Sequence, residues 1–219
     1  MSYLDVQAPA LVRQSAEEWG FYLSDAQIED MVTYLRMLQK WGRVYNLTAV
    51  LEDEAVVVKH LLDSLATAVS VYKKTEGSAQ QILDVGSGGG LPGVIWALAN
   101  PRWSVTCVDT VSKKTAFIQQ VANSLKGSLQ GRLQVEHARV EALQGQYSLI
   151  TSRAFASLPD FVSATEHLLA ADGFWAAMKG KTPDAEIQEL PATVQVFHVE
   201  PIEVPMLSEE RCLVWIGRR

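Results

Sequence analysis

The amino-acid sequence predicts a doubly wound α/β fold, in which a mostly parallel sheet carries helices on both faces. Three features indicate this fold. Residues 81–99 have the pattern of a strand, a glycine-rich loop and a helix in direct succession. Strand-like and helical segments then alternate along the chain, which is typical of parallel strands joined by crossover helices. The last two strand-like segments have no helix between them, which predicts an antiparallel hairpin.

The first 76 residues are predicted to form a helical extension before the sheet. Ser24 precedes apolar residues at three- and four-residue spacings, the pattern of an amphipathic helix with a capping serine. Residues 53–72 carry a second apolar stripe at helical spacing. Gly77 and Ser78 form a natural joint, so residues 77–219 are expected to be the main α/β domain.

Seven strands are expected in the sheet. They cover residues 81–86, 104–109, 133–138, 147–152, 173–179, 194–199 and 211–216. Helices are expected at residues 91–99, 112–126, 158–169 and 183–190, with a short turn near residues 139–143. A sheet that finishes in an antiparallel hairpin favours the methyltransferase version of the doubly wound, Rossmann-like fold over the dehydrogenase version.

The glycine-rich loop is the strongest indication of function. Asp84 ends an apolar strand pattern, and four of the next six residues are glycines, beginning at Gly86. Glycine lets a backbone approach a ligand closely, and the helix that follows offers free N–H groups at its start. Asp109 ends the next strand, 23 residues after Gly86, where a ribose diol lies in nucleotide-binding folds of this kind. The sequence therefore predicts a nucleotide-type cofactor held by Asp109.

Two cofactors fit these residues. Gly88, Gly90 and Gly93 satisfy the G-x-G-x-x-G pattern of nicotinamide enzymes, but that pattern alone is a weak signal. Asp84 two residues before Gly86 favours S-adenosylmethionine. Its side chain is expected to meet the methionyl ammonium or to organise the loop through backbone hydrogen bonds, while glycine N–H groups face the methionyl carboxylate. A nicotinamide-dependent oxidoreductase stays as the alternative.

Composition limits the location and partners of the chain. Its formal net charge of −6 argues against a basic nucleic-acid-binding protein. Residues 81–181 nevertheless carry 9 Lys or Arg against 7 Asp or Glu, which allows an anionic substrate. Cys107 and Cys212 each stand alone in an apolar run and are expected to be reduced core residues. Charges interrupt the apolar stretches before the roughly 20 residues of a membrane span, so a cytoplasmic protein without a membrane partner is expected.

Six segments together resemble the glucose-inhibited division protein B (RsmG) family. They are Trp41-Gly-Arg-Val-Tyr-Asn46-Leu47-Thr48, His60-Leu-Leu-Asp63-Ser64-Leu65, Asp84-Val-Gly86-Ser-Gly-Gly-Gly-Leu91-Pro92-Gly93, Arg139-Val140-Glu141, Ser152-Arg153-Ala154-Phe155-Ala156 and Met178-Lys179-Gly180. Their order and spacing over most of the chain are far more specific than a single glycine motif. One departure is Gly89, which stands where many relatives have proline.

This resemblance implies an enzyme that transfers a methyl group from S-adenosylmethionine to N7 of a guanine in 16S ribosomal RNA. It also implies a methyltransferase-type fold with an N-terminal helical extension. A monomer that acts on 16S ribosomal RNA, or on the assembling small ribosomal subunit, is expected. The non-enzymatic alternative is an RNA-binding module on a methyltransferase scaffold.

The resemblance also indicates site residues. It implies that Gly86 and Leu91 lie against the cofactor, with the backbone of Val140 and Glu141 along the adenine edge. Arg153 is the candidate catalytic residue, because it follows the fourth strand at the edge of the sheet where such folds bind ligands. Its guanidinium is expected to contact the methionyl end of the cofactor, a phosphate or guanine O6. The candidate cofactor-binding residues are Asp84, Gly86, Gly88, Gly90, Leu91, Asp109, Val140, Glu141 and Arg153, and the candidate RNA-binding residues are Lys179 and Lys181.

The remaining polar motif is His60, Asp63 and Ser64. These residues fall within about one helical turn, which does not orient them as a catalytic relay. His60 and Asp63 are expected to meet each other at i, i+3 and to fix the N-terminal helices against the main domain. Asn46 and Thr48 are expected to order a loop over the site or to form an ordinary turn. The other histidines lack metal-ligand spacing, and no metal is assigned.

Overall fold

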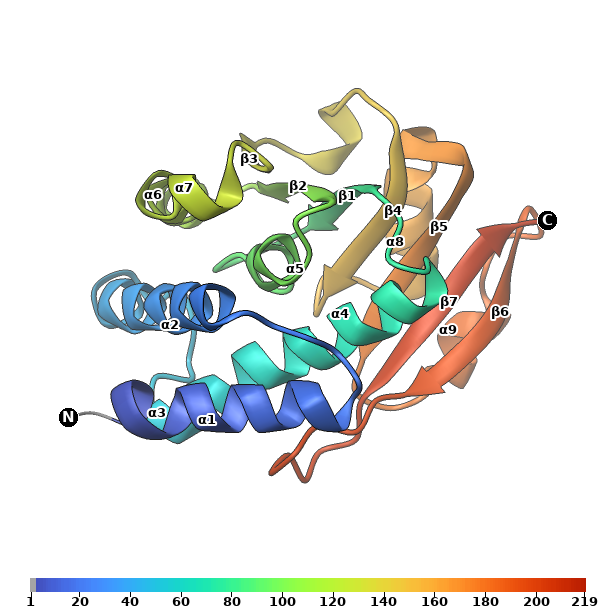
Figure 1. Ribbon diagram of the computed structural model, residues 1–219. Coiled ribbons are helices and arrows are strands. Elements are labelled where there is room, and N and C mark those ends of the chain that lie inside the picture. The colour runs from blue at the N-terminus through green and yellow to red at the C-terminus, as the bar shows by residue number, and fades with distance from the viewer. Residues whose placement is uncertain (1–2) are drawn as a thin grey trace.

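The computed structural model describes residues 3–219, so the first two residues of the predicted extension lie outside the described part of the chain. Its centre is a seven-stranded sheet with the strand order β3-β2-β1-β4-β5-β7-β6 (Figure 1). The strands are β1 (Gln80–Val85), β2 (Trp103–Asp109), β3 (Leu133–His137), β4 (Tyr147–Arg153), β5 (Leu169–Lys179), β6 (Val194–Pro201) and β7 (Cys212–Arg218).

Strand pairing follows the predicted pattern. β1 pairs in parallel with both β2 and β4, and the pairs β2–β3 and β4–β5 are also parallel. β7 lies between β5 and β6 and runs antiparallel to both. The doubly wound sheet with an antiparallel last hairpin is therefore confirmed. The carboxyl ends of β1, β2 and β4 meet at one edge, where doubly wound folds bind ligands.

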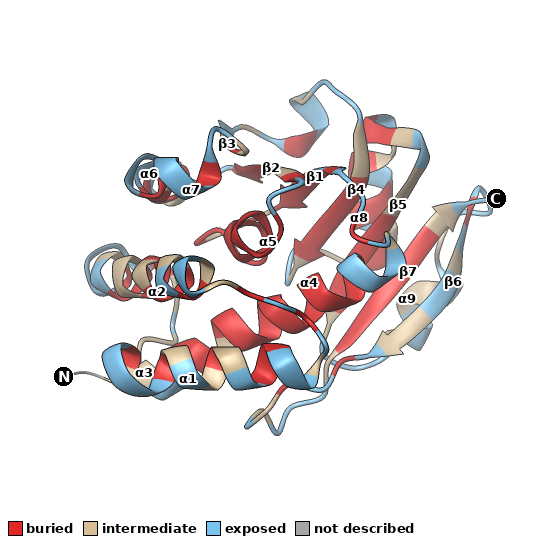
Figure 2. Ribbon diagram, viewed as in Figure 1, coloured by how far each residue is buried: buried red, intermediate tan, exposed pale blue. Residues whose placement is uncertain are grey.

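Helices cover both faces of the sheet. One face packs on the helices that precede β1 and follow β1 and β2, and Ile82 and Leu149 point into this larger core. The neighbouring residues Leu83 and Ile150 point into the opposite core, under the helix that follows β4. This alternation is the period-two pattern of a strand buried on both sides, and Figure 2 shows the central strands buried.

The helices of the larger face are α1 (Tyr3–Glu18), α2 (Asp25–Tyr45), α3 (Asp53–Val56), the π-helix η1 (Val57–Leu62), α4 (Asp63–Lys74), α5 (Gly93–Ala99), α6 (Ser112–Ser124) and α7 (Lys126–Leu129). The remaining helices are the 3₁₀ turns η2 (Val140–Ala142) and η3 (Glu166–Leu168), with α8 (Leu158–Thr165) and α9 (Asp184–Gln188). The helices before β1 share a core with the sheet. A domain boundary between residues 76 and 77 stays a prediction.

The start of α2 shows how local sequence and tertiary packing combine. Ser24 and Gln27 form a reciprocal capping box at the helix start. The Gln27 N–H donates to the Ser24 hydroxyl, and the Ser24 N–H donates to the side-chain oxygen of Gln27. The same Gln27 side chain donates to the carbonyl oxygens of Leu98 and Ala99, both at 2.9 Å. The cap therefore also fixes α2 against the end of α5, on the face of the sheet that carries the glycine-rich loop.

Two segments differ from the prediction. The helix expected at residues 158–169 ends at Thr165, and β5 begins at Leu169 rather than near Gly173. The helix expected at residues 53–72 contains η1, a six-residue π-helical stretch. By length and composition this 22-residue helical segment, Asp53–Lys74, could cross a membrane, contrary to expectation, but most of its apolar window is buried inside the protein. It is packed as a core helix.

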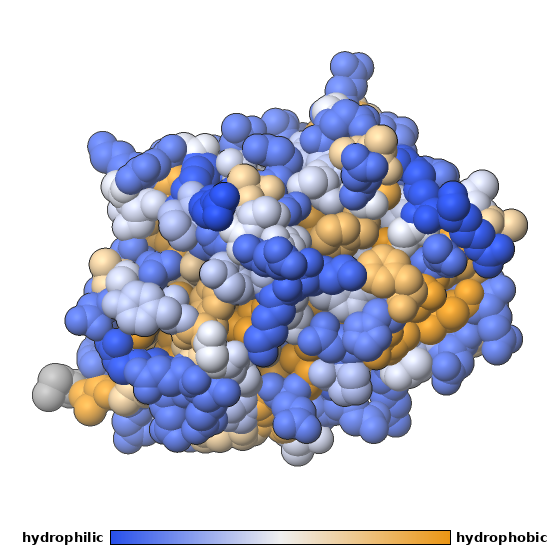
Figure 3. All heavy atoms as spheres, turned by 45° about the vertical axis from the view of Figure 1, so that its right-hand side comes forward, coloured by the Kyte–Doolittle hydropathy of each residue, from blue (hydrophilic) through white to orange (hydrophobic). Residues whose placement is uncertain are grey.

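The outer hairpin of β6 and β7 carries apolar surface. Figure 3 brings this side of the molecule forward and shows apolar side chains in a band between polar ones. Phe197 on β6 is 43% exposed, and its ring lies 6.5 Å from that of Trp215. The Lys74 ammonium sits 4.9 Å from the Phe197 ring centre and covers part of it. The end of α4 thus contacts the last strand pair.

Candidate functional site

The glycine-rich loop between β1 and α5 folds back onto the end of β2. The amide groups of Gly86 and Ser87 both donate to the Val108 carbonyl oxygen, at 2.9 and 3.1 Å. Gly86 has a φ of 65°, in the left-handed region that favours glycine. A Cβ on Gly86 would also lie 2.6 Å from Cδ2 of Phe155. Both backbone conformation and lack of space therefore require glycine at this position.

Asp109, at the end of β2, joins the loop to the next connection. One carboxylate oxygen accepts the Gly88 N–H at 2.9 Å, and the other accepts the Val111 N–H at the same distance. The Lys114 ammonium stands 3.9 Å from the carboxylate and supplies positive charge. A carboxylate has about four lone-pair sites. Asp109 therefore keeps acceptor capacity for a ligand after fixing the backbone on both sides.

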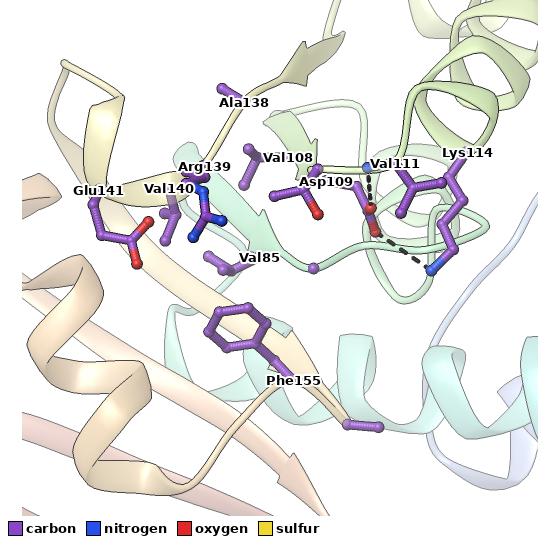
Figure 4. Close-up of a pocket in the computed structure, with 13 residues that line it drawn as sticks. Val85, Val108, Asp109, Val111, Lys114, Ala138, Arg139, Val140, Glu141 and Phe155 are labelled. Atoms are coloured by element: carbon purple, nitrogen blue, oxygen red, sulfur yellow. Dashed lines mark hydrogen bonds and ion pairs between the residues drawn. The ribbon is translucent and has the colours of Figure 1, made fainter.

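A cleft with a volume of about 330 Å³ opens beside these residues (Figure 4). It lies at the carboxyl ends of β1 and β2 and is completed by the turns that follow β3 and β4. In Figure 4 Phe155 faces Val85 and Val140 across the cleft, while Asp109 and Lys114 lie at its other end. The residues that line it are Val85, Gly86, Val108, Asp109, Thr110, Val111, Lys114, Ala138, Arg139, Val140, Glu141, Ala154 and Phe155.

The structure separates the candidate cofactor residues into groups. Gly86, Asp109, Val140 and Glu141 line the cleft. Gly88, Gly90 and Leu91 are outside its lining, in the body of the loop. Gly88 and Gly90 take left-handed φ values of 57° and 91°, which let the loop turn. Leu91 is buried in the larger core just before the cis-bonded Pro92, so its side chain anchors the loop from behind.

Asp84 is buried beneath the loop, with no exposed surface. One carboxylate oxygen accepts the Gly93 N–H at 2.9 Å, at the start of α5. Two roles were expected for Asp84, and this hydrogen bond fits the second, in which Asp84 organises the loop through its backbone. Burial raises the pKa of Asp84 to about 7, although the bond from Gly93 opposes the shift. A Cβ on Gly93 would lie 2.7 Å from this carboxylate, so glycine permits the contact.

Some residues of the cleft had no role in the sequence-based prediction. Phe155 forms a wall of the cleft while remaining 41% exposed, and Arg139 and Lys114 add positive charge to the lining. Arg139 and Phe155 stand inside two of the segments that carry the family resemblance. Lys114 lies five residues after Asp109, in the first turn of α6, but no sequence pattern distinguishes it from a surface lysine.

Arg153 lies in a second cavity, of about 400 Å³, between the N-terminal helices and the ends of β4 and β5. Ala154 lines both this cavity and the cleft, with a φ of 55° that turns the chain between them. The two spaces are therefore neighbours on either side of one backbone segment. The second cavity is lined by Val50, Lys59, His60, Asp63, Arg153, Ala154, Met178, Lys179, Gly180 and Arg211.

Asp63 connects three parts of the chain at this cavity. Its carboxylate accepts from Arg153 Nη1 at 3.3 Å and from Arg211 Nε at 3.1 Å. Arg153 Nη1 also donates to the Lys59 carbonyl oxygen, in η1, at 3.1 Å. Asp63 is 3% exposed, whereas each arginine retains about a quarter of its side-chain exposure. A buried carboxylate thus holds two partly exposed guanidinium groups at the cavity.

The expected contact between His60 and Asp63 is wrong. His60 Nε2 instead lies 2.8 Å from the Thr48 hydroxyl, whose oxygen also accepts the Val50 N–H at 3.1 Å. Thr48 therefore forms a side-chain turn with Val50 and also joins the loop after α2 to η1, so its contacts fit both alternatives expected. Burial, together with the positive charge of Arg153, lowers the pKa of His60 to about 4, so this imidazole is neutral at physiological pH.

The two candidate RNA-binding lysines differ in their surroundings. Lys179 Nζ donates to the Ala156 carbonyl oxygen at 2.9 Å and to the Glu186 carboxylate at 2.7 Å. Its charge is therefore already paired and holds the loop after β4. Lys181 is exposed and lines a third, shallow cavity of about 530 Å³ near the loop before β7. Its ammonium is the more accessible of the two.

Sequence comparisons identify relatives over nearly the whole chain. A family model described as "GidB: rRNA small subunit methyltransferase G" matches residues 27–214. The "Ribosomal RNA small subunit methyltransferase G" of Leptothrix cholodnii is 50% identical over 205 residues, covering 93% of this chain and 93% of the relative. The protein of the same name from Methylibium petroleiphilum is 48% identical over 209 residues, covering 95% and 93%.

Solved structures support the fold. The glycopeptide N-methyltransferase MtfA complexed with S-adenosyl-L-methionine gives a TM-score of 0.62 at 10% identity, over 72% of this chain and 95% of that one. TrmN from Thermus thermophilus gives 0.55 at 14% identity, over 74% and 53%. At these identities the likeness concerns the fold alone. The sequence matches carry the assignment: this chain belongs to the rRNA small subunit methyltransferase G family.

Proposed function

We propose that this protein transfers the methyl group of S-adenosylmethionine to N7 of a guanine in 16S ribosomal RNA. Membership of the family, with close relatives over nearly the full chain, is the observation that carries this proposal. Its partner is 16S ribosomal RNA or the assembling small ribosomal subunit, on which it acts as a monomer in the cytoplasm. A nicotinamide-dependent oxidoreductase and a non-catalytic RNA-binding module both lack such support.

The cleft has groups that suit S-adenosylmethionine. The bare backbone at Gly86 leaves room that a side chain would fill. Asp109 retains acceptor capacity for the ribose hydroxyls, at the end of β2. The apolar side chains of Val85 and Val140 suit the faces of an adenine ring, and the first N–H groups of the turn η2 lack intrahelical partners. These residues would hold the cofactor, while Asp84 keeps the loop in shape behind them.

The protein's part in the reaction is mainly positioning. When bound, S-adenosylmethionine supplies a methyl group on a sulfonium, which is electrophilic without further activation. The guanine N7 carries a free lone pair in the base plane, so no protein base has to remove a proton before attack. The chain therefore has to hold N7 about 3–3.5 Å from the methyl carbon and in line with the bond that breaks. The neutral His60 and the paired Asp63 fit a site without a strong free base.

The direct test is transfer of a labelled methyl group. The protein is incubated with methyl-labelled S-adenosylmethionine and either naked 16S ribosomal RNA or small subunits from a strain that lacks the protein. Mapping of chain cleavage after borohydride and aniline treatment then locates 7-methylguanine. One labelled guanine in one of the two substrates is the expected result. Absence of transfer to both substrates would contradict the proposed function.

A further inference from the structure

The second cavity has the composition of a binding site for a flat, partly polar ring. Val50 and Met178 provide apolar surface on its walls, while Arg153 and Arg211 bring two guanidinium groups to it. A pocket with mostly apolar lining and a few convergent polar groups is the usual form of a small-ligand site. Its volume of about 400 Å³ exceeds that of the cleft assigned to the cofactor.

Arg153 keeps donor capacity at this cavity. Both of its bonds, to the Lys59 carbonyl oxygen and to the Asp63 carboxylate, leave from Nη1. The Nε–H and both Nη2–H groups therefore have no hydrogen-bond partner among residues 3–219. A guanidinium has five N–H groups in a fixed plane, so three of them are left for a ligand. The Lys59 carbonyl oxygen and the buried Asp63 carboxylate together hold Nη1 in place.

The position of Arg153 beside the cleft decides which edge of a base it would meet. Ala154 follows Arg153 directly and lines both spaces, so that Arg153 stands at the wall between them. A guanine in the second cavity must turn N7 toward the cleft to receive a methyl group. O6 lies next to N7 on the same edge of guanine, and both are acceptors. Adenine carries an amino donor in place of O6, which a guanidinium cannot accept.

We infer that the second cavity binds the acceptor nucleobase, and that Arg153 selects guanine by donating a hydrogen bond to O6, beside the reacting N7. Asp63 is a positioning residue, since it holds the guanidinium without touching the base. This inference rests on the proposed function and goes beyond it in naming the base pocket and the residue that reads the base. The base enters the pocket unstacked from the RNA, as for other enzymes that modify bases.

The test removes O6 and Arg153 separately and together. Full-length 16S ribosomal RNA is assembled by ligation with guanine, 2-aminopurine or inosine at the mapped position. 2-Aminopurine lacks both O6 and the N1 proton of guanine, while inosine keeps both and loses only the N2 amino group. Single-turnover transfer is measured at saturating S-adenosylmethionine with excess protein. Rates are divided by the reactivity of the same RNA toward dimethyl sulfate, which reports the intrinsic nucleophilicity of N7.

The expected result is coupling between Arg153 and O6. The unaltered protein should transfer to guanine at least tenfold faster than to 2-aminopurine. In Arg153→Ala this ratio should fall below about threefold, because the donor to O6 is gone. The ratio of guanine to inosine should be the same in both proteins, since Arg153 does not face N2. An unchanged ratio of guanine to 2-aminopurine in Arg153→Ala would overturn the inference.

A milder pair of variants covers the case in which Arg153→Ala is too slow to measure. Asp63→Asn keeps the shape of the side chain but loosens both guanidinium groups, and should reduce the ratio of guanine to 2-aminopurine at least threefold. Its affinity for S-adenosylmethionine, measured by calorimetry, should stay unchanged, because Asp63 is outside the cleft. Asp172→Asn removes an exposed carboxylate at the opposite end of β5 and serves as the matched control.

The outcomes separate this inference from the proposed function. If the unaltered protein methylates guanine and 2-aminopurine at equal normalised rates, Arg153 does not recognise O6. The inference is then wrong, and the proposed function stands. The same conclusion follows if Asp63→Asn discriminates as well as Asp172→Asn does. If the unaltered protein does not methylate guanine at all, the proposed function is wrong, and this inference falls with it.

Discussion

The amide of Gly88 donates a 2.9 Å hydrogen bond to the carboxylate of Asp109, so the glycine-rich loop after β1 and the end of β2 hold each other in place. The two residues are 21 positions apart in the sequence. A single side chain thus fixes the loop and also borders the cleft in which the cofactor is proposed to bind. Loop order and cofactor affinity are expected to change together when Asp109 is altered.

Replacement of Asp109 tests this relationship. Asp109→Ala removes the acceptor for Gly88 and Val111 and, in the proposal, the acceptor for the ribose hydroxyls. Hydrogen bonds to a charged group contribute roughly 1.5–3 kcal/mol each, so affinity for S-adenosylmethionine should fall at least tenfold by calorimetry. Asp109→Asn keeps one acceptor oxygen and should give an intermediate affinity. Wild-type affinity in a folded alanine variant would rule out the ribose role.

The backbone of Gly86 is the second test. Gly86→Val places a branched side chain against Phe155 and forces it into a left-handed conformation. Loss of cofactor binding with partial loss of stability is expected. Gly131→Val is the matched control, because Gly131 also has a positive φ, of 78°, but has open space around it. Equal cofactor affinity in the two variants would show that the cleft is not the cofactor site.

Arg153 should contribute to both rate and stability. Arg153→Ala is expected to slow methyl transfer at least tenfold, which corresponds to about 1.4 kcal/mol. It also removes one of two partners of the buried Asp63, so the free energy of unfolding should fall by about 1–3 kcal/mol. Arg153→Lys should recover little of the rate if a planar donor is needed. Single-turnover rates measure the first effect and urea unfolding the second. Wild-type rates of methyl transfer in both variants would show that Arg153 contributes to stability alone.

Asp84 makes stability depend on pH. Its pKa is raised from 3.8 to about 7 in the folded protein, so folded molecules retain a proton that the unfolded chain releases. The stability linked to this proton is fully present below pH 3.8 and is lost as the pH rises through about 7. Asp84→Asn cannot titrate. Its free energy of unfolding, relative to the unaltered protein, should therefore rise between these pH values by about 4 kcal/mol. Urea unfolding across this range measures the difference, and parallel pH profiles would contradict the raised pKa.

Replacement of Lys181 should weaken RNA binding, whereas replacement of Lys179 should lower stability. Lys181 is exposed, so Lys181→Ala should weaken RNA binding and reduce the slope of log affinity against log salt by about 0.7, as expected for one lost phosphate contact. Lys179 is paired with Glu186 and the Ala156 carbonyl oxygen, so Lys179→Ala should instead lower stability by about 1–3 kcal/mol. Filter binding at several salt concentrations and thermal unfolding distinguish the two. A wild-type salt slope in Lys181→Ala would remove this lysine from the RNA surface.

The sequence by itself determined the features that depend on neighbouring residues. Apolar runs predicted the seven strands because each pattern is local. Central strands such as β1 and β4 are buried on both faces, whereas β3 and β6 lie at the edges of the sheet and are mostly exposed or half-buried. The glycine cluster predicted the loop, since left-handed φ values at Gly86, Gly88 and Gly90 favour glycine wherever the chain turns. Asp109 was predicted at the cleft because parallel strands bring their carboxyl ends to one edge.

Tertiary structure alone decided the contacts between distant segments. Asp63 lies 90 residues before Arg153 and 148 before Arg211, and it bonds both rather than its helical neighbour His60. No periodicity encodes this choice, because it depends on how η1 packs against the ends of β4 and β5. The burial of Asp84, and with it the raised pKa, also arises when α5 closes over the strand. Local patterns thus fixed the elements, whereas packing between them set which polar groups share a site and how strongly each is charged.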